Sequence, residues 1–242
     1  MKQHNAVITA LEKLGGQATF AELYSQVMKI KDCIWGTKTP FASIRRIVQQ
    51  RPEIFKVRPG LWALHSYKDI LGLTEYTDKK DISSELIEQN HSYYQGILVS
   101  LGNLRGFSTY VPNQDKNKLF VNKPLKALRS LQELPAFSHD FLVKRSSTID
   151  VIWFNNRLMP DSFFEVEYST DIQNSLLKFY DLRDFHARMV IVADENRKEN
   201  YNQKISRSFL ADINSRVKFL NYNTLVRQFE SEVFQASQTF TI

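Results

Sequence analysis

The stretch from residue 147 to 194 constrains the fold most, because short apolar runs and one helical pattern follow each other closely. Two apolar runs, "STIDVIWF" and "FFEVEYST", flank the polar loop "NNRLMPDS", and this arrangement predicts an antiparallel β-hairpin. A helical pattern then spans "DIQNSLLKFYDLRDF", for which Ser169 or Thr170 is the expected cap. The next run, "RMVIVAD", is almost wholly apolar, as expected of a strand in a buried sheet.

Similar patterns extend over residues 83–242. We expect, in chain order, a helix from about Ser84, a strand in "FSTYVP", a helix near 199–214, a strand in "VKFLNY" and a helix near 223–236. Residues 113–140 carry mixed signals and predict only a short helix around 125–131. This order predicts an α/β domain in three layers, with a mixed sheet as the middle layer.

Residues 1–66 predict a separate small domain, joined to the larger one by a polar linker over residues 67–82. Helical spacing of apolar residues occurs three times, with Thr39 and Pro40 expected to begin the third helix. The runs "IFKV" and "LWAL" around the turn "RPG" then predict a hairpin. Three helices and a hairpin are the order of a winged helix-turn-helix. The segment "TPFASIRRIVQQRPEIFKVRPGLWAL" resembles the HARE-type winged helix found beside nucleases and chromatin factors.

The charge of the protein is concentrated in this first domain. Residues 1–66 hold ten Lys and Arg against four Asp and Glu, whereas the remainder is neutral. Such a basic module favours binding to double-stranded DNA, although a winged helix that binds another protein would show the same solvated basic face. Side chains expected to read bases or contact phosphates are Ser43, Arg45, Arg46, Gln49 and Gln50 on the third helix, and Lys56 and Arg58 on the wing.

Several classes of protein are excluded by composition. Cys33 is the only cysteine, which excludes an internal disulfide framework and a cysteine-rich zinc site. The five His residues show no spacing typical of a zinc enzyme. No run of about 18 apolar residues exists, so we expect no membrane span and a cytoplasmic protein.

Acidic residues mark the predicted hairpin as a candidate site. If the hairpin is symmetric about the loop, Asp150 lies opposite Glu165, with the two Cβ atoms about 4.5–5.5 Å apart. Glu167 shares the face of Glu165 because side chains alternate along a strand. Buried carboxylates at this distance repel each other, and a divalent cation such as Mg²⁺ would compensate them. A solvated face whose acids pair with Lys or Arg is the alternative.

Asp150, followed on the next strand by Glu165-Val166-Glu167 and then by a capped helix, resembles the PD-(D/E)XK nuclease motif. The strings "FFEVEYSTDIQNSLLKFYDL" and "HSYYQGILVSLGNLRGFSTYVPNQDK" are similar to those of restriction-endonuclease-like proteins, over roughly residues 84–222. The resemblance implies a restriction-endonuclease-like core in which Asp150, Glu165 and the Val166 carbonyl bind a catalytic Mg²⁺, for which Mn²⁺ can substitute.

Glu167 departs from the usual pattern, because the resemblance implies a lysine at this position. The expected roles of Glu167 are general base or additional metal ligand. Lys178 is a candidate to replace the missing positive charge, or a residue of a solvated helix face. The resemblance also implies an acidic or amide residue near the metal from the first helix of the domain, where Glu88 and Gln95 are candidates, with surface exposure as the alternative.

Together these features predict a DNA endonuclease, with restriction or anti-phage defence as the expected setting. We expect a homodimer, since cutting both strands takes two active centres, and a cognate methyltransferase is a possible partner. The alternative is a non-catalytic DNA-binding protein, in which a degenerate nuclease fold serves dimerisation or partner binding. A third reading has the first domain bind a protein while the second domain acts alone.

Overall fold

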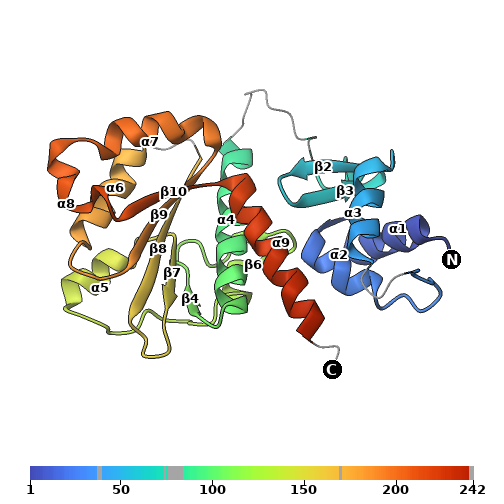
Figure 1. Ribbon diagram of the computed structural model, residues 1–242, viewed down its shortest axis with the longest axis horizontal. Helices are drawn as coiled ribbons and strands as arrows, with labels where there is room; N and C mark the ends of the chain where they lie inside the picture. The colour runs from blue at the N-terminus through green and yellow to red at the C-terminus, as the bar shows by residue number, and fades with distance from the viewer. Residues whose placement is uncertain (37–39, 74, 76–83, 169–170, 240–242) are drawn as a thin grey trace. The chain divides into compact units, whose positions relative to one another are not determined.

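The computed structural model describes residues 1–36, 40–73, 75, 84–168 and 171–239 (Figure 1). The chain divides into two compact units, of which Ile82–Glu232 forms one and Met1–Asp81 with Val233–Ile242 forms the other. Within the described residues, no helix is both long enough and apolar enough to cross a membrane.

The first unit contains three helices and a hairpin in the predicted order, together with a short strand that the sequence did not predict. Its elements are α1 (Gln3–Lys13), β1 (Gln17–Thr19), α2 (Phe20–Val27), α3 (Phe41–Gln50), β2 (Ile54–Arg58), β3 (Leu61–Leu64) and the 3₁₀ turn η1 (His65–Tyr67). The three strands form an antiparallel sheet in the order β1-β3-β2. Apolar side chains of all three helices pack into one core beside this sheet.

Local signals explain where these helices begin and end. The α1 helix stops before Gly15 and Gly16, which both have positive φ angles, and the Gly16 amide donates to the Leu11 carbonyl at 2.9 Å. Thr19 and Glu22 form a capping box at the start of α2. The prediction for α3 needs a correction, because Pro40 lies just outside the helix and Phe41 begins it. Thr39 lies outside the described residues.

The second unit is an α/β domain built on a mixed sheet, as predicted (Figure 1). Its five strands are ordered β10-β9-β8-β7-β4, with β8, β9 and β10 parallel and β7 antiparallel to both of its neighbours. These strands are β4 (Ser108–Tyr110), β7 (Val151–Phe154), β8 (Pro160–Glu167), β9 (Arg188–Ala193) and β10 (Val217–Asn221). The short strands β5 (Leu119–Phe120) and β6 (Lys123–Pro124) form a separate pair.

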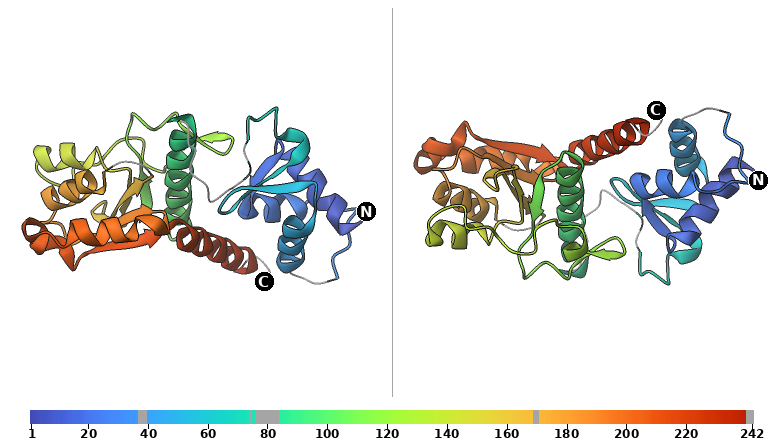
Figure 2. Two further views of the ribbon diagram at one scale, coloured as in Figure 1. Left: turned by 90° about the horizontal axis from the view of Figure 1, so that it is seen from above. Right: turned by 90° about the horizontal axis from the view of Figure 1, so that it is seen from below.

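Helices cover both faces of this sheet (Figure 2). On one face lies α4 (Ser84–Leu104), where the Trp153 indole donates to the Leu98 carbonyl at 3.1 Å. Apolar residues of the other helices pack against the opposite face, which Ile152 and Phe163 share. These helices are α5 (Asp140–Ser146), α6 (Ile172–Asp181), α7 (Lys198–Ile205) and α8 (Ala211–Asn214). The last helix is α9 (Tyr222–Thr239), and the 3₁₀ turns are η2 (Leu125–Ala127), η3 (Glu195–Arg197) and η4 (Ser208–Leu210).

Two predicted helices of this domain need correction. The helix expected over 199–214 is divided into α7 and α8, because Arg207 adopts an extended conformation before η4. Asp171 caps α6 by accepting from the Gln173 amide at 3.0 Å, whereas the expected caps, Ser169 and Thr170, lie outside the described residues. In the mixed stretch 113–140, the short helix expected near 125–131 is only the turn η2.

Candidate active site

The β7–β8 hairpin has the predicted register over its central pairs. Val151 lies opposite Phe164, and Ile152 opposite Phe163, before the register shifts by one residue near the loop. One detail of the prediction is wrong, because Asp150 is not part of the strand and directly precedes β7. Its carboxylate instead accepts a hydrogen bond from the Val166 amide at 2.7 Å, which ties Asp150 to the neighbouring strand. Asp150 therefore remains beside the Glu165-Val166-Glu167 segment.

Glu165 and Glu167 point together toward α6. Both are almost fully buried, at 2% and 3% exposed, and the Ser175 hydroxyl lies within hydrogen-bonding distance of both carboxylates. A single serine proton cannot compensate two buried negative charges. This arrangement therefore favours a nearby cation or a bound proton.

Lys178, two turns into α6 from its start, supplies that cation. Its ammonium lies 2.8 Å from Oε2 of Glu165 and 3.1 Å from Oε1, and it also donates to the Thr148 carbonyl at 2.9 Å. Burial raises the pKa of Glu165 well above its usual range, and the charge of Asp150 raises it further, while Lys178 and Ser175 oppose the shift. We call Glu165, Glu167, Ser175 and Lys178 the Glu165 pocket.

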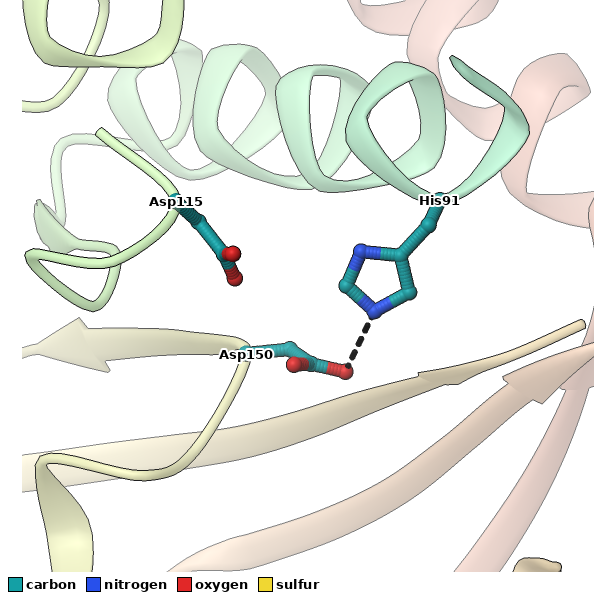
Figure 3. A group of neighbouring side chains, drawn as sticks. All are labelled: His91, Asp115 and Asp150. Carbon is teal, nitrogen blue, oxygen red and sulfur yellow. Dashed lines mark hydrogen bonds and ion pairs between the residues drawn. The ribbon is translucent and has the colours of Figure 1, made fainter. Parts of the chain in front are cut away.

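A second group of polar side chains lies on the α4 side of Asp150 (Figure 3). His91 from α4, Asp115 from the loop before β5 and Asp150 place one potential ligand atom each within 4.8 Å of one another. Nε2 of His91 is 3.1 Å from Oδ2 of Asp150. Burial alone would lower the pKa of His91, but the hydrogen bond and charge of Asp150 outweigh this and raise it.

Gln95 connects the two aspartates of this group. It is fully buried, and its amide nitrogen donates to Oδ2 of Asp115 at 2.9 Å and to the main-chain carbonyl of Asp150 at 3.2 Å. Lys118 lies 2.9 Å from Asp115 and 3.5 Å from Glu88. We call His91, Gln95, Asp115 and Asp150 the His91 cluster.

The candidates from the first helix of the domain thus have different surroundings. Gln95 lies inside the cluster, whereas Glu88 is exposed and forms an ion pair with Lys118. Sequence reasoning missed His91 and Asp115 as site residues. The spacing of Glu88, His91 and Gln95 on one side of a helix was the available signal for His91, whereas Asp115 falls in a stretch without periodicity.

The carboxylates around the hairpin have the donor chemistry of a divalent-cation site. Asp150 and Glu165 are buried oxygen donors, of the kind that Mg²⁺ prefers. Both oxygens of Glu165 contact Lys178, so an ion bound between Asp150 and Glu165 would have to displace this ammonium.

Comparison of the sequence with models of known protein families identifies the family of the second domain. The model of the family described as "Type II restriction enzyme NmeDI C-terminal domain" matches residues 73–238, about two thirds of the chain. The chain belongs to this family. No curated protein and no solved structure gives a significant match.

Membership of the NmeDI C-terminal domain family confirms the expectation of a restriction-enzyme-like protein. The matched range contains both the Glu165 pocket and the His91 cluster, and it leaves residues 1–72 outside. The PD-(D/E)XK motif and the winged helix stay predictions.

The expected DNA-binding residues lie outside the range that the NmeDI C-terminal domain family covers. On α3, Ile44 and Val48 are fully buried, which leaves the opposite helix face to solvent. That face contains the exposed side chains Arg45, Arg46, Gln49 and Gln50 and the half-buried Ser43. On the hairpin, Lys56 is half-buried, but Arg58 is only 7% exposed, contrary to the expectation of a phosphate contact on the wing.

Proposed function

We propose that this protein is a DNA endonuclease that uses Mg²⁺ to hydrolyse phosphodiester bonds, in the setting of restriction or anti-phage defence. The observation that carries the proposal is the buried carboxylate group of the β7–β8 hairpin, which lies within the part of the chain that belongs to a restriction-enzyme family. Carboxylates buried at this density are unstable without cations, and nucleases use such groups to hold metal ions.

In this proposal, Asp150, Glu165 and the Val166 carbonyl hold the ion, and Mn²⁺ can replace Mg²⁺. The bound ion would polarise the phosphodiester and lower the pKa of a bound water. Glu167 would accept a proton from the attacking water or add a metal ligand, and Ser175 orients its carboxylate. Lys178 would compensate the charge of Glu165 before the ion binds and provide a positive charge near the reacting phosphate. The products would carry 5′-phosphate and 3′-hydroxyl ends.

The first unit would bind the target as a winged helix. The exposed Arg and Gln side chains of α3 are of the types that hydrogen-bond to base edges in the major groove. The excess of six positive charges in residues 1–66 would add contacts with phosphates. Two copies of the chain would supply two active centres, one for each strand of the DNA, and a methyltransferase would protect host sites.

A non-catalytic DNA-binding protein is the alternative, and two observations favour it. The usual motif lysine is replaced by Glu167, and Lys178 already occupies both oxygens of Glu165. In this alternative the Glu165 pocket is a closed structural element that never receives an ion.

One experiment separates the two functions. Purified protein is incubated with plasmid and phage DNA in Mg²⁺ or EDTA, in parallel with Glu165→Gln and with the control Glu199→Gln. Glu199 is an exposed acid on α7, so its substitution makes the same change in charge away from the site. The nuclease proposal predicts Mg²⁺-dependent cleavage by wild type and control, and loss of cleavage but not of gel-shift binding in Glu165→Gln. Binding without cleavage in all three proteins would support the alternative.

A further inference from the structure

We propose that the His91 cluster is a metal site of its own, which binds Mn²⁺ in preference to Mg²⁺ through His91, Asp115 and Asp150. Its use in DNA cleavage rests on the proposed function, whereas ion binding does not. Asp150 is the one ligand that this site shares with the ion expected between Asp150 and Glu165.

The three ligands come from separate elements that the fold brings together (Figure 3). Their donor atoms lie within 4.8 Å of one another, and Nε2 of His91 lies 3.1 Å from Oδ2 of Asp150. Neighbouring ligands of an octahedral ion with bonds of about 2.1 Å are separated by roughly 3 Å. The three donor atoms are therefore close enough for side-chain rotations to bring them onto one ion.

Buried polar atoms without partners point to a missing ligand at this place. Neither Nδ1 of His91 nor Oε1 of Gln95 has a hydrogen-bond partner within the described residues, although both atoms are buried. In Figure 3, Nδ1 lies on the side of the imidazole that faces Asp115. A buried polar atom without a partner costs free energy, so the presence of two in one cluster favours a group that binds there.

The Gln95 amide provides a neutral oxygen for the same ion. Its nitrogen now contacts the Asp115 carboxylate and the Asp150 carbonyl. A half-turn of the amide exchanges its nitrogen and oxygen, and it would direct Oε1 toward the space between the two aspartates. Because Gln95 is fully buried, this oxygen has no access to bulk water as a substitute.

The donor types decide which ion fits. Carboxylate and amide oxygens suit Mg²⁺ and Mn²⁺ alike, but an imidazole nitrogen favours the transition metal. Lys118 forms an ion pair with Asp115, and Nε2 of His91 lies within hydrogen-bonding distance of Asp150. An ion bound at Nδ1 of His91 would leave in place both the hydrogen bond between Nε2 and Asp150 and the ion pair between Lys118 and Asp115.

The test measures ion binding directly on the full chain. Mn²⁺ is titrated and its free concentration is followed by electron paramagnetic resonance, and competition with Mg²⁺ gives the preference. We expect one Mn²⁺ bound at this site per chain, at least about tenfold more tightly than Mg²⁺. His91→Ala should weaken Mn²⁺ about tenfold or more and remove most of the preference, and Asp115→Asn should weaken both ions.

Matched controls keep the outcome interpretable. His186→Ala and Asp212→Asn make the same substitutions at exposed positions of the same domain, and both should bind Mn²⁺ like wild type. Circular dichroism confirms that each variant is folded, and the nearly isosteric Asp115→Asn tests the site independently of His91. Unchanged Mn²⁺ affinity in folded His91→Ala and Asp115→Asn would overturn the site. If Mn²⁺ binding depended on His91 but the protein cleaved no DNA, the metal site would be supported and the proposed nuclease function would be rejected.

Discussion

The Glu165 pocket and the His91 cluster lie on either side of one hairpin, and they differ in whether their buried polar atoms all have partners. In the pocket, Lys178 and Ser175 satisfy the carboxylates from within the chain. In the cluster, Nδ1 of His91 and Oε1 of Gln95 are buried without partners among the described residues. This difference in unpartnered atoms indicates that burial of acids alone does not identify a ligand site. The unpaired atoms beside the acids are the more specific sign.

Substitution of Asp150 should have the largest effect, since this residue belongs to the His91 cluster and its charge also acts on Glu165. Asp150→Asn keeps the side-chain shape but removes the charge, and we expect cleavage to fall by on the order of 10²–10³-fold. Mn²⁺ binding should weaken in parallel, because the cluster loses a charged ligand. Glu165→Gln should reduce cleavage to a similar degree but leave Mn²⁺ binding at the His91 cluster within about twofold, as measured by spin-resonance titration. If Asp150→Asn and Glu165→Gln lost Mn²⁺ binding equally, the two regions would form one metal centre and not two.

Removal of the pocket's cation should destabilise the fold. At a pH where Glu165 is ionised, Lys178→Met leaves this charge buried without its ion-pair partner, and we expect the free energy of unfolding to fall by about 3 kcal/mol. Urea unfolding in EDTA measures this loss. The control Lys144→Met removes an exposed lysine of α5 and should change stability little. If Lys178→Met lowered the free energy of unfolding no more than Lys144→Met, the ion pair between Lys178 and Glu165 would not stabilise the protein.

Substitutions in the first unit should have a smaller effect, on DNA affinity, and should not alter the Glu165 pocket or the His91 cluster. Arg46→Ala combined with Gln50→Ala removes two exposed side chains of α3, and DNA affinity should fall by about 2 kcal/mol, or roughly 30-fold. Lys13→Ala, an exposed position at the end of α1, serves as a control in the same gel-shift assay. Unchanged affinity in the double variant would instead support a first unit that binds a partner protein.

The pH dependence of stability gives the finest test of the pocket. The pKa of Glu165 is raised by burial, so in the metal-free protein its protonated form stabilises the fold fully below the ordinary value of 4.5. This contribution is lost as pH rises from 4.5 toward the raised value, at about 1.4 kcal/mol per pH unit. The side chain in Glu165→Gln cannot ionise. In urea unfolding, the free energy of unfolding of this variant should therefore fall less steeply as pH rises from 4.5 to the raised pKa of Glu165. If wild type and Glu165→Gln had identical dependences of stability on pH, the pKa of Glu165 would not be raised in the folded protein.

Much of the fold and part of the site were predictable from the sequence. The hairpin register follows from apolar alternation on both sides of a polar loop, and it placed Glu165 near Asp150. Asp150 itself was assigned to a strand because it lies within an apolar run, whereas it directly precedes β7 and its carboxylate accepts a hydrogen bond from the Val166 amide. Asp115 could not be predicted, since its position depends on how an irregular loop folds against α4.

Cleavage of DNA by the wild-type protein tests the central claim most directly. A panel of unmodified and modified phage and plasmid DNAs is incubated with the full chain in Mg²⁺, Mn²⁺ or EDTA, and the fragment ends are sequenced. The account predicts discrete fragments with 5′-phosphate and 3′-hydroxyl ends in either metal and none in EDTA. Intact DNA under all conditions, together with retained gel-shift binding, would contradict it and indicate a DNA-binding protein that does not cut.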